Sequence, residues 1–444
     1  MSFLERLFSP GSIALIGASK DETKLGGIIL RNLLQFKGRV YPVNPKYREI
    51  MGLKAYPSSA DVPGKCDLVI IMRPAPEVPA ILHGLQGRTR CAVIMSSGFA
   101  ETGQIGLQEE VKKISAGSGI RILGPNCMGI YNPSQRLDTF FLPRERLKRP
   151  GRGNVGIVSQ SGAILSCLLG AAASSRTGVS KVVGYGNAMD IDESELYEYL
   201  AEDEDTEVVV SYIESVADGR RFLEKARILS EKKALLILKA GKGESGQAAA
   251  FSHTGRLAGR YEVFHSLLRR FNISEAMDFD GLMDATKALS YQRPGRGNRV
   301  CIITNGGGSG VLAADECMSQ GLEVTSLPGP SKEKLGRVFP LYYGINNPVD
   351  LTAQVKDDDY ATALEELKGD YDGFLIIVLP NVMGITEGLA EKLMASRKYL
   401  SKPLVCHIAE GGITARLTRL VERTRIPVYS SPERAVRALK ALLG

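Results

Sequence analysis

The histidine at position 253 stands in a segment whose composition suits covalent catalysis. The segment AGKGESGQAAAFSHTGRLAG (240–259) is dense in Gly, Ala and Ser, which lets backbone and ligand approach each other closely. A neutral imidazole nitrogen is a good nucleophile toward phosphorus when a partner fixes the proton on the other nitrogen. His253 is therefore a candidate for carrying a phosphoryl group, but a histidine without a catalytic role in a glycine-rich loop would leave the same pattern. The other histidines fall in helical patterns (His83, His265) or in an apolar strand (His407).

Glu214 is the natural candidate for the partner that orients His253. It ends the run EVVVSYIE (207–214), which predicts a strand in the same sheet as the strand before His253. In a parallel sheet, the ends of neighbouring strands face the same ligand edge. A solvated glutamate at a strand end would leave the same pattern, so this alternative stays open.

A third group of polar residues lies in the run NVGIVSQSGAILSCLLGAA, which predicts a strand, a tight turn and a helix of small and apolar residues. Unsatisfied N–H groups and the positive end of the helix dipole make such a turn an anion site. Ordinary serine capping of a helix would give the same sequence. The phosphate-binding candidates are Ser159, Gln160, Ser161 and Gly162.

Small-residue turns follow other predicted strands as well. IGASKDETKLGG (16–27) opens a helix but lacks the GxGxxG spacing, and Asn44, Pro45 and Lys46 stand where a dinucleotide site needs an acidic residue. Lys46 would suit a phosphate better than a ribose diol. ITNGGGSGVLAADE offers a second possible phosphate-binding helix start within Asn305 to Gly310. At both places, glycines needed only for a tight turn explain the spacing equally well. The residues of the second helix start are Gly307, Gly308, Ser309 and Gly310.

Short runs rich in Val and Ile alternate with longer amphipathic stretches, which is the pattern of βαβ units and mostly parallel sheets. Three such series predict three α/β domains, at residues 1–130, 151–292 and 298–444, with a polar, proline-bearing linker at 131–150. The similarity of the second and third series suggests related folds. The predicted strands are 12–17, 40–44, 67–72, 91–97 and 120–125, then 154–159, 181–186, 207–214 and 234–241, then 299–307, 322–327, 373–381, 403–411 and 426–431.

The composition is that of an ordinary globular protein of several domains. The chain has 444 residues and a net charge of +7, which is spread through all segments without the basic stripe and interleaved aromatics of a nucleic-acid binder. Its seven cysteines are separated singles without a CxxC pair, so we expect reduced thiols and no metal site in this chain. No run approaches membrane-spanning length, and we expect a cytoplasmic protein.

In order and spacing, the strand ends of the first domain resemble the CoA-binding domain of the α-subunit of succinyl-CoA synthetase and of its relatives, the ADP-forming acetyl-CoA synthetases. The resemblance extends over the whole chain, because the third series and NNPVDLT (346–352) resemble the extra flavodoxin-like domain of the ADP-forming branch. It implies a Rossmann-like CoA-binding domain followed by two flavodoxin-like parallel-sheet domains. The residues that it implies for coenzyme A are Gly17, Ala18, Ser19, Lys20, Asn44, Pro45, Lys46, Arg73, Pro74, Ser96, Ser97 and Gly98.

The resemblance also implies roles around the thioester. Asn126, Gly186 and Asn187 correspond to its vicinity, Glu214 to the partner of the phosphorylated histidine, and residues 159–162 to the helix start that holds phosphate. The implied function is that of an α-subunit of an ADP-forming acetate or acyl-CoA ligase, which converts acyl-CoA, ADP and phosphate into carboxylic acid, ATP and CoA. The implied intermediates are an acyl phosphate and a phosphohistidine at His253.

The nucleotide end of this reaction has no counterpart in the sequence. No GxxxxGK[ST] P-loop occurs, and no segment resembles an ATP-grasp domain. We therefore expect a separate ATP-grasp β-subunit that binds ADP or ATP with Mg²⁺, and the resemblance implies an α2β2 heterotetramer. The preferred carboxylic acid cannot be derived from the sequence.

Two other functions are compatible with parts of the sequence. A non-catalytic CoA-binding sensor or regulatory protein would explain residues 1–130 but would leave the glycine loops of the other domains without a role. A nicotinamide-dependent dehydrogenase is disfavoured by the missing GxGxxG and by the residues at 44–46.

Overall fold

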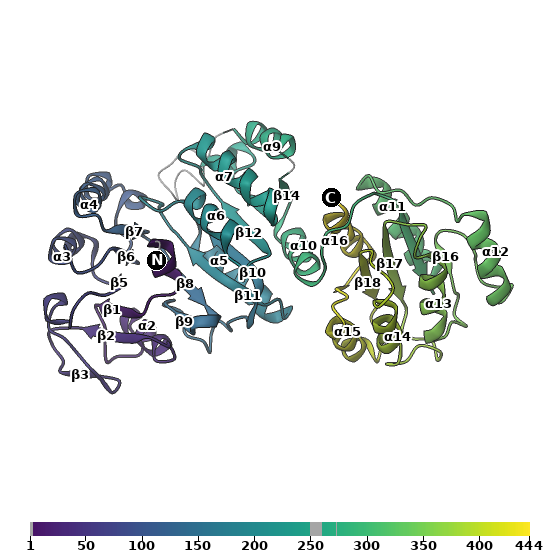
Figure 1. Cartoon of the computed structure of the whole chain (residues 1–444), viewed down its shortest axis with the longest axis horizontal. Helices are drawn as coiled ribbons and strands as arrows, with labels where there is room; N and C mark the ends of the chain where they lie inside the picture. The colour runs from purple at the N-terminus through teal and green to yellow at the C-terminus, as the bar shows by residue number, and fades with distance from the viewer. Residues whose placement is uncertain (1–2, 249–259, 272) are drawn as a thin grey trace. The chain divides into compact units, whose positions relative to one another are not determined.

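A computed structural model of the chain describes residues 3–248, 260–271 and 273–444 (Figure 1). It divides into two compact units, Met1–Met277 and Asp278–Gly444. The first unit contains two large sheets and the second unit contains one. In each sheet the five parallel strands follow the order 2-1-3-4-5 along the chain, so all three are doubly wound α/β sheets. The three parallel-sheet series predicted from the sequence are confirmed.

The first sheet runs in the order β2-β1-β5-β6-β7, and all its pairings are parallel. Its central strands are buried along their whole length because helices cover both faces, as their unbroken Val and Ile runs predict. The winding direction changes between β1 and β5, which is where doubly wound sheets bind ligands. The elements are α1 (Phe3–Phe8), β1 (Ser12–Ile16), α2 (Leu25–Leu33), β2 (Arg39–Val43), a hairpin of β3 (Glu49–Ile50) and β4 (Leu53–Lys54), β5 (Leu68–Ile71), α3 (Val78–Gly84), β6 (Cys91–Ile94), α4 (Ile105–Ser118) and β7 (Arg121–Leu123).

The second sheet has seven strands in the order β14-β13-β12-β10-β11-β8-β9. The two strands at one end of this sheet, β8 and β9, pair antiparallel with their neighbours, and β9 and the end of β8 fall in the segment that the sequence predicted to be a linker, 131–150. The winding direction changes between β10 and β12. The elements are β8 (Gly129–Asn132), β9 (Leu137–Asp138), β10 (Arg152–Ser159), α5 (Gly162–Ser174), β11 (Val179–Gly184), α6 (Glu193–Glu202), β12 (Val208–Ile213), α7 (Gly219–Lys232), β13 (Ala234–Lys239), α9 (Tyr261–Arg270) and β14 (Ser274–Ala276).

The third sheet, in the second unit, runs β16-β15-β17-β18-β19 with all strands parallel. Helix α10 packs against α16 in this unit, whereas the sequence prediction included residues up to 292 in the second domain. The elements are α10 (Phe279–Tyr291), β15 (Val300–Thr304), α11 (Gly307–Ser319), α12 (Gly329–Val338), β16 (Val349–Asp350), α13 (Asp357–Leu367), β17 (Gly373–Val378), α14 (Leu389–Ser396), β18 (Leu404–Ile408), α15 (Thr414–Arg423), β19 (Val428–Tyr429) and α16 (Pro432–Leu443).

The predicted strand at 322–327 is wrong. Only Glu323 forms a bridge, to Arg299, and β16 takes the second strand position instead. The side chain of Asn347 explains the exchange: its Oδ1 accepts from the amide of Ile302 at 3.0 Å, and its Nδ2 donates to the carbonyl of Val300 at 2.8 Å. These bonds occupy the edge of β15, so the earlier segment cannot pair along it.

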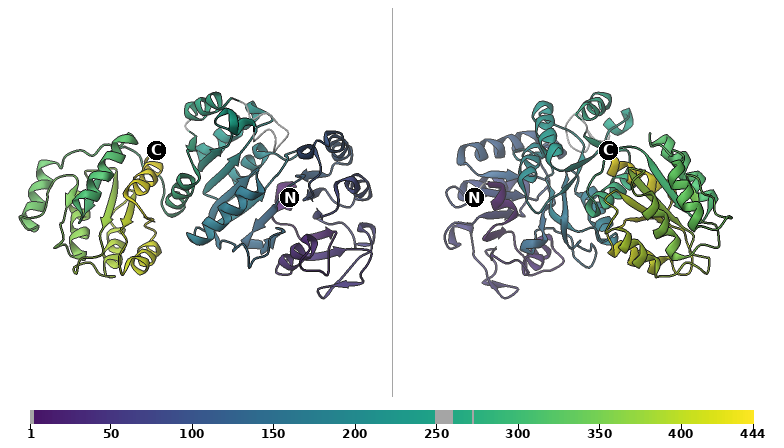
Figure 2. Two further views of the ribbon diagram at one scale, coloured as in Figure 1. Left: turned by 180° about the vertical axis from the view of Figure 1, so that it is seen from behind. Right: turned by 45° about the vertical axis from the view of Figure 1, so that its right-hand side comes forward.

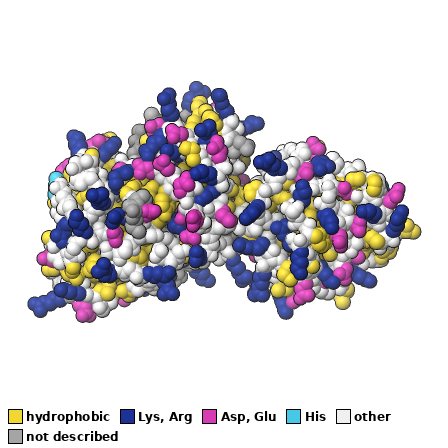
Figure 3. Space-filling model, in the orientation of Figure 1, with side chains coloured by type: hydrophobic (Ala, Val, Ile, Leu, Met, Phe, Trp, Pro, Cys, Tyr) yellow, Lys and Arg dark blue, Asp and Glu magenta, His cyan; other side chains and the backbone are white. Residues whose placement is uncertain are grey.

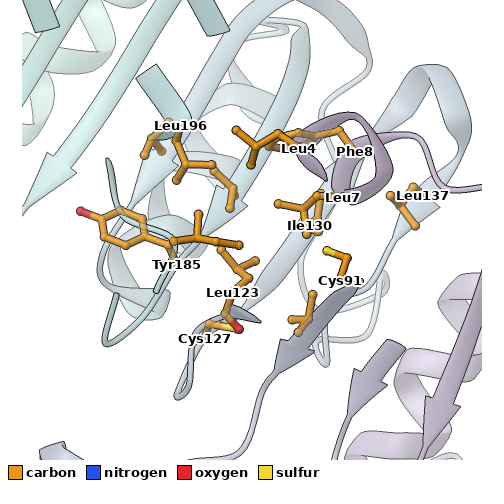
Figure 4. Close-up of a cluster of buried hydrophobic side chains, with 14 of the residues drawn as sticks. Leu4, Leu7, Phe8, Cys91, Leu123, Cys127, Ile130, Leu137, Tyr185 and Leu196 are labelled. Atoms are coloured by element: carbon orange, nitrogen blue, oxygen red, sulfur yellow. The ribbon is translucent and has the colours of Figure 1, made fainter. Parts of the chain in front are cut away.

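The first two sheets share one continuous hydrophobic core. Leu7 and Phe8 of α1 lie in the same cluster as Leu123 of β7 and as Ile130 and Leu196 of the second sheet and its helices (Figure 4). A shared core of this kind fixes the ligand edges of the two sheets relative to each other within the first unit. The arrangement of helices around both sheets is visible from two further directions in Figure 2.

Lys and Arg side chains are interspersed with Asp and Glu over the face drawn in Figure 3. None of the described helices is long and apolar enough to cross a membrane.

Candidate active site

A cavity of about 340 Å³ opens in the first unit, where loops of the first two sheets meet. Seven of the residues predicted from the sequence lie in its wall, from four separate loops. They are Asn126, Gln160, Ser161, Gly162, Gly186, Asn187 and Glu214. Because residues 160–162 follow β10 and Glu214 follows β12, the cavity lies at the point where the second sheet changes its winding direction.

The start of helix α5 forms one side of the cavity. Ser161 is its N-cap, and the Ser161 hydroxyl accepts a hydrogen bond from the amide of Ile164 at 3.4 Å. Serine capping is therefore present, but it satisfies only one of the amides that a helix start leaves free. Gly162 and Ala163 of the first turn face the cavity, so capping and anion binding are compatible. Ser159 differs from its neighbours: it is fully buried, donates to the carbonyl of Ser161 at 2.8 Å and does not line the cavity.

The Gln160 side chain joins this helix start to Glu214. Its Oε1 accepts from the amides of Glu214 at 2.8 Å and Ser215 at 3.0 Å, and its Nε2 donates to the Ser215 hydroxyl at 3.1 Å. Gln160 therefore positions the loop after β12, and its role as a phosphate ligand stays a prediction. Glu214 is only 5% exposed, so the alternative of a solvated strand-end residue does not describe it. Burial and the charge of Glu214 raise the pKa of the neighbouring Tyr212.

A buried lysine lies beneath the same loop. Lys239, the last residue of β13, is 2% exposed and donates to the carbonyls of Glu214 at 2.7 Å and Ala240 at 2.5 Å. Burial lowers the pKa of Lys239 to about 8, although the charges of Glu214 and Glu275 oppose that shift. Its ammonium fixes the Glu214 backbone and supplies positive potential beside the carboxylate.

Two loops from different sheets meet at Gly186. A Cβ at this position would lie 2.3 Å from the carbonyl oxygen of Asn126 and 2.4 Å from that of Pro125, and φ of Gly186 is +58°. Only glycine allows this approach and this backbone angle without strain. The amide of Asn187 then donates to the Pro125 carbonyl at 3.0 Å, and the Asn126 side chain donates to Asn187 Oδ1 at 3.3 Å. Of the three residues predicted to lie near the thioester, Asn126 and Asn187 are therefore hydrogen-bonded to each other, and Gly186 lies against Asn126.

Glu101 extends this contact to the predicted CoA loop, and it was missed in the sequence. One of its carboxylate oxygens accepts from the amides of Gly98 at 2.6 Å and Phe99 at 3.2 Å, and the other accepts from Asn187 Nδ2 at 2.6 Å. Gln108 of α4 also accepts from Asn187 Nδ2, at 3.0 Å. Burial alone would raise the pKa of Glu101, but these hydrogen bonds hold it below its usual range. An ionised Glu101 therefore connects loop 96–98 to the cavity.

The residues predicted to hold coenzyme A lie at the carboxyl edge of the first sheet. Gly17 follows β1 with φ of +94°, and a Cβ there would lie 2.2 Å from the Met72 carbonyl oxygen after β5. Asn44 after β2 donates to the carbonyl of Ala18 at 2.7 Å, which joins two of the predicted loops. Two exposed cations, Lys20 and Lys46, are available to phosphates. The remaining members, Ser19, Pro45, Arg73, Pro74, Ser96, Ser97 and Gly98, follow the ends of β1, β2, β5 and β6.

Arg73 has a competing partner in this structure. Its guanidinium donates to Glu77 through Nε at 2.8 Å and Nη2 at 3.0 Å. The pair is on the surface, with both side chains 44% exposed, so its energetic contribution is small and a phosphate could share the guanidinium.

One predicted site lies in the other unit. Gly307, Gly308, Ser309 and Gly310 form the first turn of α11 in the second unit, and Gly306 is its N-cap without a side-chain hydrogen bond. A Cβ on Gly307 would lie 3.0 Å from Asp350 Oδ2, so a carboxylate already stands beside this helix start and would repel a phosphate. Its role as a second phosphate site stays a prediction. His253 lies outside the residues that the structure describes.

The apolar wall of the cavity could not be read from the sequence. Its members come from separate loops, and two of them lie in the segment taken for a linker; they are Met95, Met128, Phe141 and Leu142. Cys127 also lines the cavity, but burial raises the pKa of its thiol to about 12, so the thiol is protonated at neutral pH and is a poor nucleophile.

The chain matches three family models in succession. A model described as a CoA binding domain matches residues 11–133, one described as a succinyl-CoA ligase like flavodoxin domain matches residues 152–289, and one described as a Ligase-CoA domain matches residues 300–429.

Similar proteins extend over the full chain. The α-subunit of acetate–CoA ligase (ADP-forming) II from Pyrococcus furiosus is 36% identical over 454 residues, covering 99% of this chain and 97% of the relative. Acetate–CoA ligase (ADP-forming) from Methanocaldococcus jannaschii is 38% identical over 447 residues, and this chain spans 63% of that longer protein. Among solved structures, the dinucleotide forming acetyl-coenzyme A synthetase 1 of Ca. Korarchaeum cryptofilum, in complex with phosphate and ADP, has a TM-score of 0.92 at 36% identity, covering 99% of this chain and 96% of that chain. A Pyrococcus horikoshii protein has a TM-score of 0.88 at 33% identity, covering 99% and 98%.

Proposed function

The chain belongs to the family of ADP-forming acetate–CoA ligases, and from this membership we propose the reaction and the role of each residue. The protein is an acid–thiol ligase of the ADP-forming type and acts as an α-subunit. It converts acyl-CoA, ADP and phosphate into a carboxylic acid, ATP and CoA.

The reaction proceeds in three transfers. A phosphate oxygen attacks the thioester carbonyl, the carbon–sulfur bond breaks, and CoA leaves as the thiol with an acyl phosphate remaining. A nitrogen of His253 then attacks phosphorus, and the oxygen–phosphorus bond breaks to release the carboxylate. Finally the phosphoryl group passes from His253 to ADP. Positioning and charge stabilisation dominate such transfers, so a helix start and an oriented base are the groups required.

One observation carries this proposal: a single cavity collects the start of α5, Glu214, and the Asn126 and Asn187 loops. The helix start offers amides and a positive dipole to phosphate. Glu214 would hold the proton on the other imidazole nitrogen of His253, and Lys239 keeps the Glu214 backbone in place. The role of His253 rests on its sequence context and on family membership.

The nucleotide step needs a partner. Relatives named as α-subunits imply a second chain, and we propose that this chain is an ATP-grasp β-subunit in an α2β2 assembly. We place the Mg²⁺ with the nucleotide on that subunit, where it would shield the phosphates of ADP. Among the described residues of this chain, no group of three or more His, Cys, Asp or Glu could hold a metal ion.

Coenzyme A would bind along the edge of the first sheet. Lys20 and Lys46 would meet its phosphates, and loop 96–98 would lead its thiol toward the cavity. Glu101 supports this path because it bonds both loop 96–98 and Asn187.

Labelling of the protein by phosphate tests the proposal. The purified chain, alone and with its partner, is incubated with acetyl-CoA and radiolabelled phosphate. We expect label on the protein that is stable in base and labile in acid, and none in a His253→Ala variant that still binds CoA. If the complex binds CoA but takes up no label, the result would instead support a CoA-binding sensor. The function of such a sensor would not require the cavity of the second sheet.

A further inference from the structure

A loop of the second sheet closes the outer side of the first sheet. Strand β7 is the last in the order β2-β1-β5-β6-β7, so no described strand pairs with its outer side. Residues 186–191, which follow β11 and which we call the edge loop, run antiparallel along this side with three backbone hydrogen bonds. The position of Asn187 in the cavity therefore depends on how the edge loop pairs with β7 and the residues after it. The bonds run from the amides of Asn187, Met189 and Ile191 to the carbonyls of Pro125, Gly124 and Ile122, at 3.0, 3.1 and 3.2 Å.

The edge loop has left-handed backbone on both sides of Asn187. Gly186 has φ of +58° and Ala188 has φ of +50°. Glycine adopts this conformation readily, but for alanine it is unfavourable and persists only where surrounding contacts hold it. The contacts that hold the edge loop therefore decide where the Asn187 side chain lies.

Asp190 ties the edge loop to both the backbone and a side chain of β7. Its Oδ2 accepts from the amide of Ile122 at 2.7 Å. Arg121 Nε donates to Asp190 Oδ1 at 3.0 Å and to Asp190 Oδ2 at 3.1 Å. The Asp190 side chain is 18% exposed, so these charge-assisted bonds are largely shielded from water.

Arg121 also holds the helix that follows the edge loop. Its Nη2 donates to both carboxylate oxygens of Glu195, each at 2.9 Å, and Glu195 lies in the first turn of α6. The Phe3 ring lies against the guanidinium, with its centroid 4.6 Å from Arg121 Cζ. A planar guanidinium suits this arrangement because its separate nitrogens bond two carboxylates in a fixed geometry, which an ammonium group does not reproduce.

Arg221 of α7 bonds to the same group of carboxylates from the other side. Its Nη1 donates to Asp192 at 3.1 Å and its Nη2 to Glu195 at 3.0 Å. The Arg221 side chain is 36% exposed and that of Arg121 is 35% exposed. Among the described residues, none of the hydrogen bonds of Arg221 reaches β7 or Asp190. Arg221 therefore stabilises helices of the second sheet, whereas Arg121 joins them and the edge loop to the first sheet.

We propose that Arg121 is a positioning residue for the reaction, because through Asp190 it fixes the edge loop along β7 and so places Asn187 in the cavity. This proposal rests on the proposed function and adds to it a residue that does not belong to the lining of the cavity. Asn187 bonds both Asn126 and Glu101, so a shift of the edge loop would displace the groups around the thioester together.

The geometry predicts that Arg121 affects catalysis more than binding. The cations expected to meet the phosphates of CoA, Lys20 and Lys46, follow β1 and β2, which β5 and β6 separate from β7. Loss of Arg121 should therefore leave most of the binding of acyl-CoA in place. The thioester would be misplaced relative to the start of α5, and a displacement of about 1 Å can cost about 100-fold in rate.

The test measures kcat and KM for release of CoA from acetyl-CoA in the complex with its partner, with phosphate and ADP present. The variants are Arg121→Met and its matched control Arg221→Met, because methionine keeps part of the apolar stem and removes the charge. Thermal melts of the same preparations set the assay temperature well below both midpoints, so that unfolded protein does not lower the rates.

We expect Arg121→Met to lower kcat at least about tenfold, with KM changed less than about threefold. Arg221→Met should keep kcat and KM within about twofold of the wild type, as expected for a partly exposed ion pair away from the cavity. Arg121→Lys keeps the charge without the paired geometry, so it should recover part of the lost kcat.

Three results would overturn the positioning role: equal kcat in Arg121→Met and Arg221→Met, a loss of activity carried by KM alone, or no recovery in Arg121→Lys. If Arg121→Met does not fold, Asp190→Asn replaces it, because asparagine keeps an acceptor for the Ile122 amide and removes the charge that pairs with Arg121. An unchanged kcat in Asp190→Asn would likewise overturn the role.

Phosphate labelling of the wild-type complex separates this proposal from the proposed function. If the wild type takes up no label, the proposed function itself fails. Normal labelling together with equal kcat values in the two arginine variants would reject the role of Arg121 alone.

Discussion

The Gln160→Ala variant tests whether the Gln160 side chain positions the loop after β12, through its hydrogen bonds to Glu214 and Ser215. The change leaves the amides of Glu214 and Ser215 without their acceptor, and each unsatisfied buried amide costs about 1–3 kcal/mol. Because Gln160 borders the cavity, water can reach one of these amides and recover part of the cost. We expect the free energy of unfolding to fall by about 2–3 kcal/mol.

The same change should slow the chemistry. Glu214 loses the bond that fixes its backbone, and a displacement of about 1 Å at a catalytic group can cost about 100-fold in rate. Initial rates of phosphate labelling and urea unfolding of the same preparations give both quantities. Ser215→Ala is the matched control, because it removes only the Gln160 Nε2 bond at 3.1 Å and should cost about 1 kcal/mol with near-normal labelling. If the two variants unfold at the same urea concentration and label equally fast, the positioning role of Gln160 is refuted.

Other perturbations address the loops and the buried lysine. Glu101→Ala should raise the KM for acyl-CoA about tenfold with a smaller fall in kcat, because it removes charge-assisted hydrogen bonds worth about 1.5–3 kcal/mol. Glu101→Gln should recover part of the loss. An unchanged KM in Glu101→Ala would contradict this expectation. Gly186→Ala should destabilise the chain by about 2 kcal/mol or more, because the new Cβ would lie 2.3 Å from the Asn126 carbonyl oxygen. Gly219→Ala is the control: a Cβ there would have no atom within 4 Å, so its thermal melt should match that of the wild type. The pKa of Lys239 is about 8 in the folded chain and near 10.5 in the unfolded chain, so between these pH values the unfolded chain binds the extra proton. The free energy of unfolding should therefore rise by up to about 3 kcal/mol from pH 8 to 10.5. Parallel pH profiles for wild type and Lys239→Met would contradict the Lys239 expectation.

The parallel sheets and much of the cavity were predictable from the sequence because both depend on local rules. Strands buried on both faces leave unbroken apolar runs, and ligands collect at the ends of such strands. These rules predicted that Glu214 and residues 160–162 would face the same edge, and the structure brings them into one cavity.

The features that were missed depend on contacts between distant parts of the chain. The strand expected at 322–327 has the right residue types, but the Asn347 side chain occupies the edge where it would pair. Residues 131–150 are polar and contain prolines, yet they supply an antiparallel edge and half of the apolar wall. Glu101 carries no sequence motif, and its role arises only because Asn187 approaches it from another sheet.

The most direct test of the account maps the phosphate on the protein. The complex is incubated with acetyl-CoA and phosphate, digested in mild base and analysed by mass spectrometry. The account predicts one phosphorylated peptide, which contains His253, together with its loss in His253→Asn and a strong reduction in Glu214→Gln. Phosphate on another residue, or an unchanged yield from the His253→Asn variant, would contradict it.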